Sequence, residues 1–132
     1  MNVLVDTSVW SLALRRSSPS EAIAIINLLR DLITDGKVVL LGAIRQEVLS
    51  GIRHKEQFVR LRDYLRAFPD LELTIEDYEL AAEFFNICRS NGVQGSNIDF
   101  LICAVAHLRG YSIFTTDKDF DNFRLHIPIL LL

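Results

Sequence analysis

The sequence predicts an α/β fold in which helices cover a central, mainly parallel sheet. Apolar runs of strand length alternate with segments of helical period along the chain, which favours parallel strands joined by right-handed crossovers. Hydrophobic residues make up 50% of the 132 residues and charged residues 23%, so the chain is globular and can bury a core. No linker, repeat or low-complexity segment divides it, and we expect one domain over residues 1–132.

Five apolar runs of strand length are expected to form the sheet. The first stops abruptly at Asp6, and the fourth ends at Thr116 and Asp117. The last begins with Pro128, which suits only an edge strand. In chain order, the expected strands cover residues 3–5, 38–41, 71–73, 112–115 and 128–130.

Capping and turn residues set the ends of the expected helices. Ser18 and Pro19 mark the start of the second helix, and Thr74, followed by acidic residues in the first turn, marks the start of the fifth. Asn91 with Gly92, and later Gly110, act as stops. In chain order, the expected helices cover residues 7–14, 19–34, 43–50, 54–67, 74–90, 96–109 and 118–123.

Four acidic residues are placed where they could meet at one edge of this sheet. Asp6 and Asp117 follow two strands, whose carboxyl ends lie on the same side of a parallel sheet. Glu47 lies beside the apolar stripe of its helix and is expected to share its inward side, and Asp99 lies at the edge of the buried face of another helix. Clustered carboxylates repel one another, and a divalent cation removes that cost. All-oxygen ligands favour Mg²⁺, with Mn²⁺ as a substitute.

Each of these residues also has a purely structural interpretation. Asp6 could be a loop or capping residue. Glu47 could lie at the edge of its apolar stripe and reach water. Asp99 lies three residues after Ser96 and could close a capping box. Their joint occurrence favours the metal site.

A carboxylate-held Mg²⁺ suits hydrolysis of phosphodiester bonds, because the metal activates water and stabilises the leaving oxygen. The chain has no Gly-rich phosphate loop and no Ser-His-Asp or Cys-His arrangement, which argues against a nucleotide triphosphatase and against nucleophilic catalysis. The three histidines are isolated, and Cys88 and Cys103 are expected to be reduced core residues.

Two other kinds of function remain as alternatives. A phospho-acceptor signalling domain also uses acidic residues and Mg²⁺, but it needs an acceptor Asp after the central strand, where this chain has Gly42. A haloacid-dehalogenase-like phosphatase is disfavoured because residues 6–9 lack the second Asp. A catalytically degenerate RNA-binding domain is the second alternative, against which the complete acidic set argues.

The net charge of −3 gives no global basic field that would indicate nucleic acid. Basic residues are scattered along the chain, and they could form either a solvated helix face or contacts to a substrate backbone. They are Arg15, Arg16, Arg45, Arg53, Lys55, Arg60, Arg62 and Arg66. No apolar run approaches the length of a membrane span, and the N-terminus lacks the pattern of a signal peptide. We therefore expect a soluble, cytoplasmic protein with no membrane contact.

The chain resembles the PIN-domain ribonucleases, specifically the VapC-type toxins of type II toxin–antitoxin systems. Four segments carry the resemblance in family order and spacing: residues 5–10, 42–51, 99–106 and 115–120. The resemblance implies a PIN-like three-layer α/β/α sandwich. It also implies that Asp6, Glu47, Asp99 and Asp117 form the catalytic Mg²⁺ site, with Asp119 as a further ligand in some members and Thr7 and Thr116 in support.

The same resemblance implies partners that composition and spacing do not reveal. These are a structured RNA substrate of the tRNA or rRNA class, a homodimer, and a cognate VapB-type antitoxin that blocks the site. DNA would be contacted only indirectly, through the antitoxin.

Overall fold

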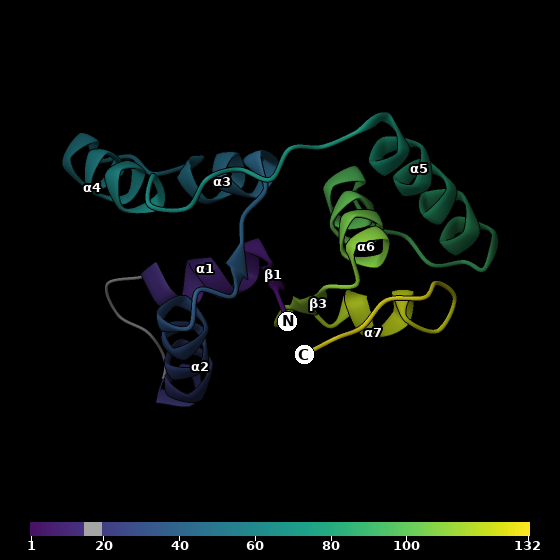
Figure 1. Cartoon of the computed structure of the whole chain (residues 1–132), viewed down its shortest axis with the longest axis horizontal. Coiled ribbons are helices and arrows are strands. Elements are labelled where there is room, and N and C mark those ends of the chain that lie inside the picture. The colour runs from purple at the N-terminus through teal and green to yellow at the C-terminus, as the bar shows by residue number, and fades with distance from the viewer. Residues whose placement is uncertain (15–19) are drawn as a thin grey trace.

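A three-stranded parallel sheet forms the centre of the protein, for which the computed structural model describes residues 1–14 and 20–132 (Figure 1). Strand β1 (Val3–Val5) lies between β2 (Val38–Val39) and β3 (Ser112–Phe114). Leu4 pairs with Val39 on one side and Ile113 on the other. All residues of β1 and β3 are buried, so the continuous apolar character of these runs reflects a sheet covered on both faces. The prediction of a parallel sheet is confirmed.

Helices cover this sheet in two groups, and the chain is an α/β/α sandwich, as predicted. Figure 1 shows α1 to α4 in the left half of the view and α5 to α7 in the right half. Helix α1 contacts α2 and α3, and α3 contacts α4, whereas α5 packs on α6. The helical elements are α1 (Thr7–Leu14), η1 (Ser20–Ala22), α2 (Ile23–Thr34), α3 (Gly42–Leu49), α4 (Lys55–Leu65), α5 (Ile75–Ser90), α6 (Asn97–Arg109) and α7 (Asp119–Phe123).

Helix ends follow the capping and turn residues closely. Gly110 closes α6 in the left-handed conformation, with φ 71°, and Thr74 and Asp77 form a reciprocal capping box at the start of α5. The predicted start of the second helix at Ser18 and Pro19 lies outside the described residues. None of the helices in the described part of the chain combines the length and apolar character that a membrane span requires.

Two of the predicted strands do not form. Residues 71–73 add no strand, and a single bridge joins Leu40 to Asp70. The Glu72 carbonyl accepts a hydrogen bond from Arg109 (3.3 Å). Residues 128–130 are likewise irregular. Pro128 has no amide hydrogen, and the sheet gains only one bridge, between Ile113 and Leu131.

The core fills the space between the sheet and both helical groups. Its largest fully buried side chains include Trp10 of α1, Phe100 of α6 and Phe120 and Phe123 of α7. The two cysteines are free and buried in this core, as predicted, and burial raises the pKa of both thiols.

One buried ion pair fixes the hairpin of α5 and α6. Asp77 is only 1% exposed, and Arg109 donates to both of its oxygens, at 2.6 Å from Nη1 and 2.9 Å from Nη2. The Thr74 amide also donates to Asp77 (2.8 Å). The first turn of α5 is thereby locked to the last turn of α6, which helps to hold α6, and with it Asp99 at its other end, in place.

Candidate functional site

Asp6 is a buried carboxylate at the carboxyl end of the central strand. It is only 5% exposed, and burying a carboxylate is costly unless it has hydrogen-bond partners. The Ser8 and Thr115 hydroxyls both donate to its Oδ2, each at 2.8 Å. Hydrogen bonds to the ionised form compensate its burial and fix its orientation. Within the described residues both of these bonds fall on Oδ2, which leaves Oδ1 for another ligand.

The loop after β3 is tied to the start of α1 by the same hydroxyls. Ser8 Oγ accepts from the Thr116 amide (3.0 Å), and Thr115 Oγ1 accepts from the Asp117 amide (3.0 Å). Asp117 is therefore tied to Asp6 through its backbone amide, which donates to the hydroxyl that itself donates to Asp6. Neither Ser8 nor Thr115 was predicted as a site residue; the position of Thr115 at the end of a predicted strand was the available signal.

Asp99 enters the same site from the first turn of α6. It forms a reciprocal capping box with Ser96, which donates to Asp99 Oδ2 (3.0 Å) and accepts from its amide (3.1 Å). Burial raises the pKa of Asp99, and the negative charges of Asp6 and Asp117 raise it further, against the opposing effect of the Ser96 bonds. The capping-box interpretation of Asp99 is confirmed, and its role as a metal ligand stays a prediction.

Glu47 and Asp119 lie at the edge of this cluster. The prediction that Glu47 points inward with the apolar stripe of α3 is wrong, because its side chain is exposed while Ile44 and Val48 are buried. Glu47 instead accepts a hydrogen bond from the hydroxyl of Thr7, at 2.7 Å. Thr7 directly follows Asp6 in the sequence. Asp119 is also exposed, and its amide donates to Asp117 Oδ1 (2.9 Å).

No protein cation neutralises these acids in the described part of the chain. The ion pairs that it forms lie elsewhere, in Arg45–Asp70, Arg62–Asp63, Arg66–Asp63, Arg109–Asp77 and Arg124–Asp121. Within residues 1–14 and 20–132, no three side chains of the ligand-forming types are arranged closely enough to hold a metal ion as they stand. The oxygen donors and their uncompensated charge nevertheless fit a hard divalent cation.

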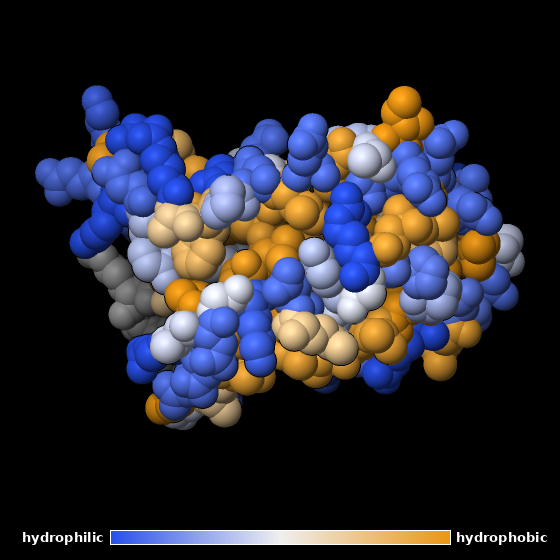
Figure 2. All heavy atoms as spheres, in the orientation of Figure 1, coloured by the Kyte–Doolittle hydropathy of each residue, from blue (hydrophilic) through white to orange (hydrophobic). Residues whose placement is uncertain are grey.

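The basic residues considered as substrate contacts have mixed environments. Arg45 is bound to Asp70 (2.9 Å) and to the Phe68 carbonyl, so it has a structural role. Helix α4 carries exposed basic side chains, seen as deep blue at the upper left of Figure 2. Arg15 and Arg16 lie outside the described residues.

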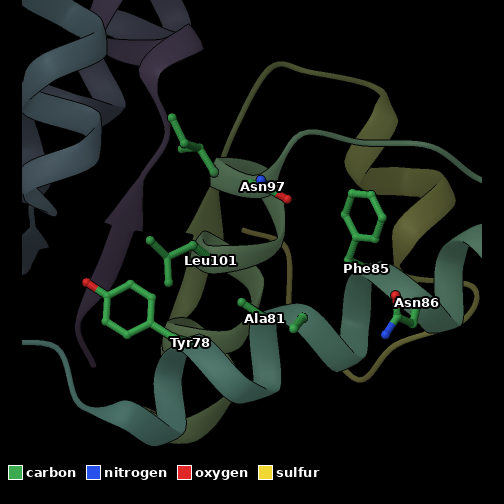
Figure 3. Close-up of a pocket in the computed structure, with 8 residues that line it drawn as sticks. Tyr78, Ala81, Phe85, Asn86, Asn97 and Leu101 are labelled. Atoms are coloured by element: carbon green, nitrogen blue, oxygen red, sulfur yellow. The ribbon is translucent and has the colours of Figure 1, made fainter.

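An apolar cavity of about 420 Å³ lies between α5 and α6, and its lining includes none of the acids. Figure 3 shows Tyr78, Ala81 and Phe85 of α5 facing Asn97 and Leu101 of α6 across it. Its wall offers few polar groups, so it has no chemistry in common with the carboxylate cluster.

Comparison with known proteins identifies a family to which the sequence is similar and solved structures that share its fold. A family model described as PIN domain matches residues 3–125. The comparison with curated proteins gives no significant match.

Three similar solved structures share the fold over nearly the whole chain. FitAcB from Neisseria gonorrhoeae has a TM-score of 0.77 and 18% identity, covering 98% of this chain and 96% of its own. VapBC2 from Rickettsia felis, bound to a DNA fragment from its promoter, has a TM-score of 0.78 and 17% identity, covering 100% and 98%. VapBC-5 from Mycobacterium tuberculosis, of the VapBC family of toxin–antitoxin systems, has a TM-score of 0.68 and 18% identity, covering 100% of both chains.

Proposed function

The chain belongs to the PIN domain family, and on that premise we propose that it is a metal-dependent endoribonuclease, the toxin of a VapBC-type toxin–antitoxin pair. One observation carries the proposal. Asp6 and Asp117 are joined through Thr115 at the carboxyl end of the parallel sheet, burial together with their charges raises the pKa of Asp99, and no cation of the described residues pairs with any of the three. A site that concentrates negative charge in this way is suited to a divalent ion and, through it, to a phosphodiester.

Asp6, Asp99 and Asp117 would hold the ion, with Glu47 beside them and Asp119 as a further oxygen donor. Mg²⁺ is the expected metal and Mn²⁺ a substitute, since hard cations prefer carboxylate oxygens. A divalent ion in such a site lowers the pKa of bound water and offsets charge on the phosphate.

The chain's own residues prepare this site in two ways. Ser8 and Thr115 both donate to Oδ2 of Asp6, so that its charge is positioned before any ligand arrives. Thr7 holds the exposed Glu47 carboxylate toward the same rim, and Thr116, also exposed, borders it. The buried acid would hold the metal while the exposed groups meet the substrate.

The substrate we propose is structured RNA of the tRNA or rRNA class, and the partner a VapB-type antitoxin that covers the site. The matched VapBC structures, one of them with promoter DNA, support a toxin of this kind. On this basis DNA would be contacted through the antitoxin, and two copies of the chain would pair as a homodimer.

The decisive experiment replaces single carboxylates by amides of the same shape. Asp6→Asn and Asp99→Asn should each lower RNA cleavage in Mg²⁺ by at least about 100-fold, because a ligand charge is lost while the local bonds can persist. Asp31→Asn on the exposed face of α2 is the matched control and should cleave like the parent protein.

Cleavage is followed on a denaturing gel with total cellular RNA, and circular dichroism verifies that each variant is folded. Undiminished cleavage by either site variant, or full activity in EDTA, would overturn the proposal. RNA binding with no metal-dependent turnover by the parent protein would instead favour a degenerate RNA-binding domain.

A further inference from the structure

We propose that a small pocket beside Asp117 binds a backbone phosphate of the RNA strand, with Lys118 and Arg124 as its positioning residues. The pocket, here called the α7 pocket, is lined by Thr115 to Lys118, Asp121, Arg124, Leu131 and Leu132. The inference rests on the proposed function, which it deepens by assigning residues that hold the substrate next to the acids.

The position of the α7 pocket links it to the carboxylate cluster. Thr115 and Asp117 belong to both, since Thr115 donates to Asp6 and the Asp117 amide donates to Thr115. A group bound in the pocket is therefore close to Asp6 and Asp117. In a nucleic acid strand the neighbour of the reacting phosphate is another phosphate, which makes this the expected ligand.

The pocket holds two cations, Lys118 and Arg124, beside two acids, Asp117 and Asp121, and the cations are the groups that can bind a phosphate. Lys118 forms no ion pair among the described residues, and Arg124 has only a loose one, 3.6 Å from Asp121, with both side chains more than half exposed (52% and 61%). An exposed pair of this kind contributes little, so Arg124 can exchange Asp121 for a phosphate. Arg62 and Arg45, by contrast, are already bound at 3.1 and 2.9 Å to Asp63 and Asp70.

The size of the pocket limits what it can hold. Its volume of about 210 Å³ corresponds to about seven water molecules at ~30 Å³ each. That is room for one phosphate with its ester oxygens. A strand whose phosphate enters the pocket would be led across the end of β3 toward the acids, with the two cations attracting its backbone.

Binding of single-stranded RNA tests this assignment separately from catalysis. The probe is a fluorescein-labelled RNA of about 12 nucleotides, measured by anisotropy at several salt concentrations in Mg²⁺. An Asp6→Asn background prevents cleavage. Lys118→Gln and Arg124→Gln should each weaken binding about fivefold to tenfold, and each should reduce the slope of log K against log salt by ~0.7.

Lys37→Gln is the matched control, because Lys37 precedes β2 at the opposite end of the sheet from Lys118. It should leave both the affinity and the salt slope unchanged. Lys118 and Arg124 are exposed, so their variants should also melt at the temperature of the parent protein.

A second readout keeps the two proposals distinguishable. In the otherwise unaltered protein, Lys118→Gln and Arg124→Gln should raise KM for RNA more than they lower kcat, and leave the Mg²⁺ dependence as it is. Parent-like RNA affinity and salt slope in both variants would overturn the α7 pocket even if the protein cleaves RNA. Weakened binding in a protein that never cleaves RNA would uphold the pocket and overturn the nuclease.

Discussion

Removing Arg109 should destabilise the protein more than removing the charge of its partner Asp77. Asp77 is 1% exposed, so Arg109→Met leaves a buried carboxylate with only its Thr74 bonds. Removing the partner of a buried charge in this way costs about 3–5 kcal/mol of stability. Asp77→Asn instead leaves the arginine unpaired, and its side chain is 21% exposed and can reach water. That change should cost about 1–2 kcal/mol.

The measurement is urea unfolding followed by the fluorescence of Trp10, the only tryptophan, which is fully buried in α1. For a domain of this size, the loss in Arg109→Met corresponds to a fall in Tm of about 10–20 °C. Arg89→Met, an exposed arginine in the last turn of α5, is the control and should stay within ~0.5 kcal/mol of the parent protein. The reasoning is refuted if Asp77→Asn costs as much as Arg109→Met.

The same pair predicts a pH dependence on the acid side. The Arg109 hydrogen bond lowers the pKa of Asp77 below its ordinary value of 3.8. Since the folded pKa is the lower one, the pair's contribution is complete above 3.8 and is lost as the pH falls through the folded pKa. When the pH is lowered from neutral to below 3.8, the melting temperature of Arg109→Met should therefore fall by less than that of the parent protein.

Three further changes test the site and its support. Thr115→Val removes the donor to Asp6 and should cost about 1–3 kcal/mol in urea unfolding and lower RNA cleavage ~10-fold; equal stability and activity would contradict this. Gly95→Ala places a Cβ 2.5 Å from the buried ring of Phe123 and should cost about 1–3 kcal/mol, which a thermal melt would measure; an unchanged melt would show that the ring yields freely. Asp99→Asn should raise Tm at pH 7 in EDTA, because the raised pKa of Asp99 means that its ionised form destabilises the fold. The gain should vanish as the pH falls toward 3.8, and a gain that persists there would contradict the assignment.

Local patterns determined the order and nature of most elements. Apolar runs that stop at Asp6 and before Asp117 identified two strands of the sheet, and residues such as Thr74 and Gly110 identified helix ends, because capping depends on neighbours in sequence. The parallel arrangement also followed, since strands separated by helices can pair only through crossovers. The strands predicted at residues 71–73 and 128–130 did not form, because their pairing depends on distant backbone partners.

Contacts between distant segments decided the rest. Thr115 reaches Asp6 across 109 positions, and Arg109 reaches Asp77 across 32, so no local pattern reveals either bond. Glu47 turned out exposed because a residue at the border of an apolar stripe is buried or solvated according to what packs against it, which periodicity does not specify. The sequence thus determined which acids are available at the carboxyl end of the sheet. Only the tertiary structure decided which side chains orient them, because a hydrogen bond requires atoms to meet within about 3 Å.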